Sequence, residues 1–327
     1  MKRILTGIKP SGEFTLGNYI GAIKKIVELQ EEYDSYIFIA DLHAITVKQD
    51  PLLLKERIRK FAAIYIACGV DPKKNTIYVQ SENEFIPSIS WLLECHTYYG
   101  EASRMIQFKE KSKENDNFTV GLLTYPVLMA ADILFCDSDY VPVGIDQKQH
   151  VELARDIAIR FNNQYGHTFT VPEPIVKESA VKIKDLKNPT KKMSKSETNP
   201  NGVITMFDTD EQIKKKIMGA TTDNECSVYY DTQEKPGISN LMDIVVSLTN
   251  YTNKEIETKF EGKNYGEFKT FVAEIVTNEI SKVREKYNQL INGEELDKIL
   301  DEGARKSKAI AEKKYKEMKE KIGLIRK

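Results

Sequence analysis

The chain has 327 residues, of which 41% are hydrophobic and 30% charged, a composition typical of a globular protein with one large domain or two ordinary ones. No apolar run approaches the roughly 20 residues of a membrane span, and glycine and proline interrupt the N-terminus before a signal-peptide core could form. We therefore expect a cytoplasmic protein with no membrane contact. The formal net charge of −1 excludes a general attraction to nucleic acid. The spacing of the four cysteines predicts no metal site.

The first half of the chain alternates predicted strands and helices. Short apolar runs at residues 3–6, 36–40, 76–80 and 140–143 predict strands. Apolar residues at helical spacing predict helices that begin near Gly17, Pro51 and Asp146. Strands that alternate with helices favour an α/β fold, in which a doubly wound, Rossmann-like sheet has parallel strands.

The second half is predicted to be mostly helical from Asp208 onward. A Lys/Pro/Ser-rich stretch at residues 187–198 predicts the boundary, which gives a Rossmann-like domain at residues 1–190 and an all-helical domain at residues 191–327. The last helix carries one narrow apolar stripe, which would allow it to pack back on the first domain. The members of this stripe are Ala304, Lys308, Ala311, Tyr315, Met318, Ile322 and Ile325. Residues 302–327 carry ten Lys or Arg against four Glu, a local charge of +6 that suits either a solvated helix face or an RNA contact.

Polar residues follow each of the four predicted strands. They occupy residues 7–11, 41–43, 81–82 and 144–147. In a parallel sheet of this kind, ligands bind beyond the carboxyl ends of the strands. The topology therefore predicts that these four clusters gather at one edge of the sheet and form a binding site.

Two loops have a composition that suits phosphate. Residues 7–12 form a Gly/Pro/Ser loop that leads from a strand into a helix, whose N-terminus attracts anions. Residues 191–196 hold three lysines and two serines, which could neutralise a polyphosphate. Taken singly, a plain turn explains the first loop better, and an exposed basic loop explains the second better. Neither loop matches the P-loop pattern.

Together these loops resemble the motifs of the class I aminoacyl-tRNA synthetases. Residues 192–196 read KMSKS without departure, and residues 10–19 read PSGEFTLGNY, similar to the form that the HIGH motif takes in the tryptophanyl branch. Thr15 and Asn18 stand where that motif has its histidines. The resemblance extends over essentially the whole chain and includes the segments RMIQFKEK, MAADIL, VPVGIDQKQH and KPGISNL.

The resemblance implies an ATP site, with Mg²⁺ bound through the phosphates and the first domain binding both ATP and an amino acid. Lys111, Lys192 and Lys195 would act on the phosphates as catalytic groups. Lys9 and Ile145 stand where glutamine and glutamate are common in the family, so only backbone contacts carry over there. The implied ATP-binding residues are Lys9, Pro10, Ser11, Gly17, Asn18, Gly144, Ile145, Asp146, Ile183, Lys192, Met193, Ser194, Lys195 and Ser196.

Asp132 carries the prediction of the amino-acid substrate. It lies in an otherwise apolar helical stretch, where a carboxylate is costly unless it is paired. It could cap a helix end, or it could accept a hydrogen bond from an indole N–H, which is only a donor. The resemblance favours the second role and implies a tryptophan pocket, whereas His96, His150 and His167 are predicted to be structural. The implied pocket residues are Asp132, Tyr125, Gln147, His43, Met129, Leu5, Val141 and Val143.

The resemblance therefore implies a homodimer that activates L-tryptophan with ATP and transfers it to tRNA(Trp), which the helical domain would contact at the anticodon. The tyrosine enzyme is the alternative within the class, since it shares the fold and a pocket carboxylate. A nucleotidylyltransferase and a non-enzymatic RNA-binding paralogue are alternatives outside it. No side chain need act as a nucleophile, because the substrate carboxylate is already one.

Overall fold

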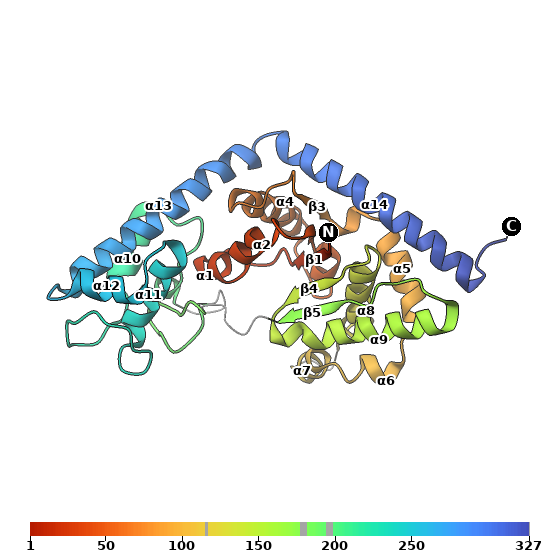
Figure 1. Cartoon of the computed structure of the whole chain (residues 1–327), viewed down its shortest axis with the longest axis horizontal. Coiled ribbons are helices and arrows are strands. Elements are labelled where there is room, and N and C mark those ends of the chain that lie inside the picture. The colour runs from red at the N-terminus through yellow and green to blue at the C-terminus, as the bar shows by residue number, and fades with distance from the viewer. Residues whose placement is uncertain (115–116, 177–181, 194–198, 327) are drawn as a thin grey trace.

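A five-stranded parallel sheet lies at the centre of the larger part of the computed structural model, which describes residues 1–114, 117–176, 182–193 and 199–326 (Figure 1). The strands are β1 (Arg3–Ile8), β2 (Asp34–Ile39), β3 (Asn75–Val79), β4 (Tyr140–Val143) and β5 (Glu173–Val176), in the order β3-β2-β1-β4-β5. The predicted fold class is confirmed, and all four predicted strands are present. The sequence did not predict β5, because its four residues, EPIV, begin with glutamate and proline and leave only Ile175 and Val176 as an apolar run.

Helices cover both faces of this sheet. Alternate strand residues face opposite sides, so Ile37 and Ile39 belong to one core cluster and Tyr36 and Phe38 to the other. The helices and single turns in this part are α1 (Leu16–Asn18), the π-helix η1 (Tyr19–Ile23), α2 (Lys24–Leu29), α3 (Asp41–Ala44), α4 (Pro51–Ala67), η2 (Gln80–Glu82), α5 (Phe85–Glu94), α6 (Tyr99–Ala102), α7 (Ile106–Glu114), α8 (Val120–Leu134), η3 (Ile145–Gln147) and α9 (Lys148–Tyr165).

The strand order reverses beside β1. The chain adds β2 and then β3 on one side of β1, and it returns to place β4 on the other side, where Ile4 pairs with Tyr140. In open α/β sheets the crevice at such a reversal is where ligands bind. The reversal therefore singles out the carboxyl ends of β1 and β4 as the place for a site.

The second part of the chain is helical, and its helices α10, α11 and α12 lie to one side of the sheet (Figure 1). It contains η4 (Pro200–Gly202), α10 (Asp210–Met218), α11 (Pro236–Leu248), α12 (Asn253–Phe260), α13 (Tyr265–Ile291) and α14 (Glu295–Ile322). Thr209, Thr252 and Asn264 start α10, α12 and α13, because each side chain accepts a hydrogen bond from the third helical N–H. The domain boundary after residue 190 stays a prediction.

Helices α13 and α14 form an arch over the molecule, and α14 lies against the edge strand β3 (Figure 1). At Gly303 the helix backbone comes so close that an added Cβ would lie 1.7 Å from the Ile77 carbonyl oxygen. The predicted stripe is partly wrong. Ala311 and Met318 are buried, but Gly303, Ser307 and Lys314 complete the buried face, whereas Ile325 is exposed beyond the helix end.

Part of the positive charge of residues 302–327 is used inside the chain. Lys314 is buried, with its Nζ 2.9 Å from Asp137, and Lys308 lies 3.0 Å from Glu84. These two lysines therefore hold α14 to the start of α5 and to the residues after α8 rather than offering free charge to RNA. Among the helices that the structure describes, none combines the length and the apolar character that crossing a membrane requires.

Candidate active site

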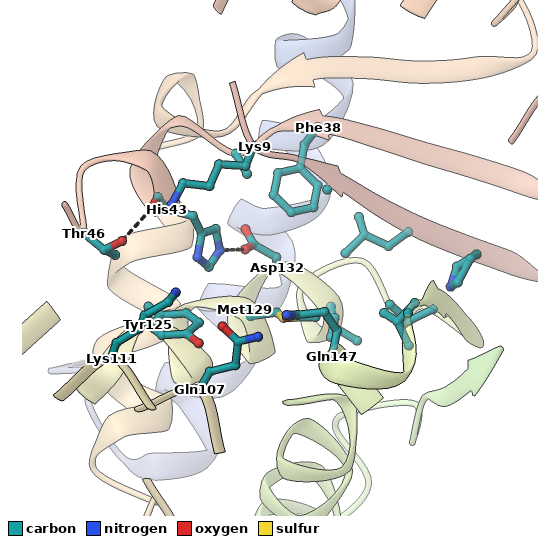
Figure 2. A pocket seen from close by; sticks show the side chains of 18 residues that line it. Lys9, Phe38, His43, Thr46, Gln107, Lys111, Tyr125, Met129, Asp132 and Gln147 are labelled. Atoms are coloured by element: carbon teal, nitrogen blue, oxygen red, sulfur yellow. Dashed lines mark hydrogen bonds and ion pairs between the residues drawn. The ribbon is translucent and has the colours of Figure 1, made fainter. Parts of the chain in front are cut away.

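A pocket of about 370 Å³ opens at the carboxyl ends of β1 and β4 (Figure 2). Its volume falls in the range of small-molecule sites, roughly 300–1,000 Å³. The structure brings together there every residue that the sequence assigned to tryptophan, together with Lys9, Lys111 and Gly144 from the predicted ATP site. These residues are Leu5, Lys9, His43, Lys111, Tyr125, Met129, Asp132, Val141, Val143, Gly144 and Gln147.

Asp132 of α8 lies fully buried in the wall of this pocket. Its Oδ2 accepts a hydrogen bond from His43 Nε2 at 2.9 Å, and Gln80 Nε2 donates to both of its oxygens at 2.8 Å. Figure 2 shows the His43 ring pointing at this carboxylate. Burial raises the pKa of Asp132, and the His43 and Gln80 bonds oppose that rise. The carboxylate is therefore paired inside the pocket and does not cap a helix end.

Sequence reasoning missed Gln80, the residue that connects this carboxylate to the edge of the sheet. Gln80 follows β3 directly and is fully buried, yet the predicted polar cluster began only at Ser81. Ser81 in turn donates from its N–H to Asp41 Oδ1 at 2.9 Å, and its hydroxyl bonds Oδ2 of the same side chain. The clusters at residues 41–43 and 81–82 are thus joined, as the parallel topology predicts. A polar residue directly after an apolar strand was the signal available for Gln80.

His150 of α9 orients two of the predicted tryptophan-binding side chains. Its Nδ1 lies 2.8 Å from Gln147 Oε1, which can only accept, so Nδ1 carries the hydrogen. Its Nε2 then accepts from the Tyr125 hydroxyl at 3.2 Å. Burial lowers the pKa of His150 to about 4, which keeps the ring neutral near pH 7, and burial raises the pKa of Tyr125 to about 12. His150 therefore has a structural role, as predicted, and that role affects the pocket. Because the Tyr125 hydroxyl donates to His150, the Tyr125 oxygen is free to accept from an ammonium group.

Two lysines line the mouth of the same pocket. Lys9 follows β1, and Lys111 comes from α7, with its Nζ 5.6 Å from the centre of the Tyr125 ring. Burial and the charge of Lys111 both lower the pKa of Lys9. A pair of cations at this place suits an anionic group that enters above the amino-acid pocket.

The HIGH-like segment contains the N-terminal cap and the first turn of helix α1. Thr15 Oγ1 accepts from the Asn18 N–H at 3.1 Å, and the Asn18 side chain accepts from the Thr15 N–H at 3.1 Å, so the two residues cap α1 reciprocally. Backbone bonds from Leu16 N–H to Ile204 O at 2.9 Å and from Met206 N–H to Phe14 O at 2.8 Å hold this segment against the chain that follows the KMSKS sequence. The two motifs are therefore neighbours in space.

The first two residues of the KMSKS sequence end a short hairpin. Lys184 pairs with Lys192 as an antiparallel bridge, and the Met193 N–H donates to Ile183 O at 2.8 Å. Ile183 and Met193 are buried, and a Cβ added to Gly17 would lie 3.5 Å from Met193 Cβ. The predicted ATP residues Ser194, Lys195 and Ser196 lie outside the described residues.

The remaining predicted ATP residues lie away from the pocket walls. Pro10 is buried, Ser11 closes a tight turn by donating from its N–H to Lys9 O at 2.8 Å, and Ile145 is 73% exposed. Asp146 Oδ2 accepts from Gln147 Nε2 at 2.8 Å, which links the ATP residues to the tryptophan residues. In the described ranges, no group of three His, Cys, Asp or Glu side chains is placed to hold a metal ion.

Comparison with known proteins identifies the class. The family described as tRNA synthetases class I (W and Y) matches residues 1–281, and this chain belongs to that family. The tryptophan–tRNA ligase of Bacillus subtilis is 51% identical to the chain over 324 residues, which cover 99% of this chain and 98% of that protein. The tryptophan–tRNA ligase of Clostridium perfringens is likewise 51% identical over 326 residues, which cover 99% and 98%. The resemblance that the motifs predicted is thereby confirmed.

Solved structures agree with this assignment. The tryptophanyl-tRNA synthetase of Campylobacter jejuni, in complex with ADP and tryptophan, is 38% identical, with a TM-score of 0.87 over 98% of this chain and 99% of that one. The enzyme of Mycoplasma pneumoniae is 36% identical, with a TM-score of 0.85 over 99% and 98%. The parallel sheet and its helical partner are therefore shared with tryptophanyl-tRNA synthetases.

Proposed function

We propose that this protein is a tryptophan–tRNA ligase that activates L-tryptophan with ATP and transfers it to tRNA(Trp). The observation that carries the proposal is the pocket at the reversal of the sheet, which holds a buried carboxylate among apolar walls and polar groups at its mouth. Relatives that are half identical over the whole chain are tryptophan–tRNA ligases, which favours tryptophan over the tyrosine alternative and over a paralogue without activity.

Asp132 supplies the substrate contact in this proposal. Among the described donors, only Gln80 reaches Asp132 Oδ1, so that oxygen keeps an acceptor position for the indole N–H. Because Asp132 is fully buried, the neighbouring side chains must yield slightly before the indole reaches it. Met129, Leu5 and the two valines of β4 form the apolar walls. A tyrosine ring would place a hydroxyl there instead of an N–H within an aromatic system.

Tyr125 and Gln147 hold the amino-acid end of the substrate. The Tyr125 oxygen accepts from the ammonium group, since its own hydrogen points to His150. This orientation leaves the substrate carboxylate near Lys9 and Lys111 at the mouth, where both cations attract it and the α-phosphate. A carboxylate oxygen then attacks the α-phosphorus, the bond to the bridging oxygen of the β-phosphate breaks, and pyrophosphate leaves.

ATP binds beside the HIGH-like segment and the hairpin, which touch where Gly17 packs against Met193, and Lys192 reaches its phosphates. Lys192, Lys195 and Lys111 neutralise the charge that develops on the leaving pyrophosphate. Mg²⁺ enters as part of the MgATP substrate and is held by the phosphates. In the second step a ribose hydroxyl of the terminal adenosine of the tRNA attacks the tryptophanyl carbonyl, and AMP leaves.

A homodimer is part of this proposal, and exposed aromatic side chains support it. Trp91, Tyr98 and Tyr99 are exposed and share a hollow of about 300 Å³. Aromatic residues of this kind are enriched where proteins associate. Sedimentation equilibrium tests the dimer: Trp91→Glu should shift a dimeric protein to monomers, and a wild-type monomer would contradict it.

Amino-acid-dependent exchange of pyrophosphate into ATP tests the activity. Each of the twenty amino acids is supplied in turn, and we expect exchange with tryptophan. Exchange with tyrosine alone would show that the tyrosine alternative is correct. Exchange with none would favour the RNA-binding paralogue. The cytoplasmic location stays a prediction.

A further inference from the structure

Asn240 of α11 holds the backbone of Lys184 with both ends of its side-chain amide. The Lys184 N–H donates to Asn240 Oδ1 at 2.7 Å, and Asn240 Nδ2 donates to Lys184 O at 3.0 Å. Asn240 is buried, and its neighbours Ile238 and Leu241 are buried in the helical core. Asn240, which belongs to the helical part, therefore both accepts from and donates to the backbone of Lys184 in the hairpin.

Lys184 is the residue that pairs with Lys192. The hairpin continues on both sides of this pair, with Met193 N–H donating to Ile183 O at 2.8 Å and Asp185 N–H donating to Lys191 O at 2.9 Å. Its register is set by these bonds, so the place of Lys184 determines the place of Lys192. The Asn240 amide thus helps to fix the position of Lys192, because Lys184 is bound to Asn240 and paired with Lys192.

The far side of the hairpin is held by different contacts. Leu186 N–H donates to Gly202 O at 2.8 Å, and Thr221 N–H donates to Leu186 O at 2.8 Å. These bonds hold the turn end of the hairpin. Asn240 acts at the open end, where Met193 packs against Gly17 of the predicted ATP site.

We infer that Asn240 is a positioning residue for tryptophan activation, which places Lys192 against the phosphates of ATP by clamping Lys184. This inference rests on the proposed function. Replacing Asn240 by alanine leaves the Lys184 N–H and C=O without their side-chain partner and lets the strand with Lys192 move. A displacement of about 1 Å in a positioned catalytic group costs up to roughly 100-fold in rate. Tryptophan binds on other elements, so its KM should not change.

The test measures tryptophan-dependent exchange of pyrophosphate into ATP with the full-length protein. For Asn240→Ala we expect kcat to fall roughly 10- to 100-fold while the KM for tryptophan stays within about two-fold of wild type. Asn162→Ala is the matched control. Asn162 also clamps a backbone with its amide, accepting from the Thr168 and Phe169 N–H groups at 2.8 and 2.9 Å and donating to Phe169 O at 2.8 Å, but far from the hairpin. Its kcat should stay near that of wild type at a similar loss of melting temperature.

A double-mutant cycle shows whether Asn240 acts through Lys192. If it does, Asn240→Ala should lower kcat by less than about three-fold once Lys192→Ala is present, because the positioned group is already gone. Fully additive effects, or a kcat for Asn240→Ala equal to that of the control, would overturn the inference. If the alanine variant does not fold, Asn240→Ser takes its place, since its shorter hydroxyl stays uncharged and can meet one of the two Lys184 backbone groups but not both. A wild-type protein without tryptophan-dependent exchange would instead refute the proposed function.

Discussion

Replacing Asp132 with alanine tests the contact on which substrate identity depends. The carboxylate is buried and already accepts from His43 and Gln80, so its only proposed role toward the substrate is one more acceptor bond, to the indole N–H. A hydrogen bond to a charged group contributes about 1.5–3 kcal/mol. At about 1.4 kcal/mol per factor of ten, its loss should weaken tryptophan binding roughly 10- to 150-fold.

A substrate analogue separates this bond from other effects of the substitution. In the benzothienyl analogue of tryptophan a sulfur atom replaces the indole N–H, so the analogue cannot donate. Wild-type protein should bind tryptophan more tightly than the analogue by roughly the same 10- to 150-fold. Asp132→Ala should bind the two ligands almost equally, because neither has a partner there.

Isothermal titration calorimetry with tryptophan, the analogue and ATP gives the required affinities. The ATP affinity of Asp132→Ala should stay close to that of wild type, since the described ATP residues do not contact Asp132. The reasoning is refuted if Asp132→Ala still prefers tryptophan over the analogue as strongly as wild type does. It is also refuted if tryptophan and ATP affinities fall together, since Asp132 would then be only structural.

Three further substitutions test the geometry elsewhere. A methyl group at Gly17 meets Met193 at an ordinary 3.5 Å, so Gly17→Ala should leave the melting temperature unchanged but raise the KM for ATP at least about five-fold if ATP needs that space. His150 has a pKa of about 4 in the fold and about 6.5 when unfolded, so its stabilising effect is full above pH 6.5 and is lost as the pH falls toward 4. Urea unfolding should therefore show wild type losing about 2 kcal/mol more than His150→Gln between pH 7 and pH 5, and equal losses would contradict this. Gly303→Ala brings Cβ to 1.7 Å from Ile77 O, so it should destabilise by about 1–3 kcal/mol in urea unfolding, whereas the helix preference of alanine alone would stabilise.

The sheet could be predicted from the sequence because its strands are continuous apolar runs. Such runs mark buried strands. Strands β2 and β3 are buried along almost their whole length, whereas β1 and β4 carry shorter apolar runs and are only partly buried. Strand β5 lacks such a run, since only Ile175 and Val176 follow its glutamate and proline. The sequence also predicted that the polar clusters lie close together, because the carboxyl ends of parallel strands lie at the same edge of the sheet.

Contacts between residues that are far apart in the chain could not be predicted from the sequence. Gln80 and Asp132 are 52 residues apart, and nothing local to either one indicates the other. Lys314 belongs to the positively charged stretch at residues 302–327, but it is buried, and Asp137, 177 residues away, meets its charge. A buried lysine needs such a partner. A pattern along one helix cannot show a partner that another element supplies.

In the proposed function, tryptophan recognition and the action of Lys192 on ATP depend on two sets of elements. The described walls of the tryptophan pocket come from the sheet and the helices that cover it, whereas Lys192 sits on a hairpin that Asn240 and Thr221 tie to the helical part. The two sets touch where Met193 packs against Gly17, and backbone bonds from Leu16 N–H to Ile204 O and from Met206 N–H to Phe14 O join the same parts. Substitutions in the pocket should therefore act mainly on the affinity for tryptophan, and substitutions at the hairpin mainly on kcat. Coupling between them can pass through these contacts or through the bound substrates. A substitution outside the pocket and the hairpin that changes both the affinity for tryptophan and kcat would therefore have altered how the two parts pack together.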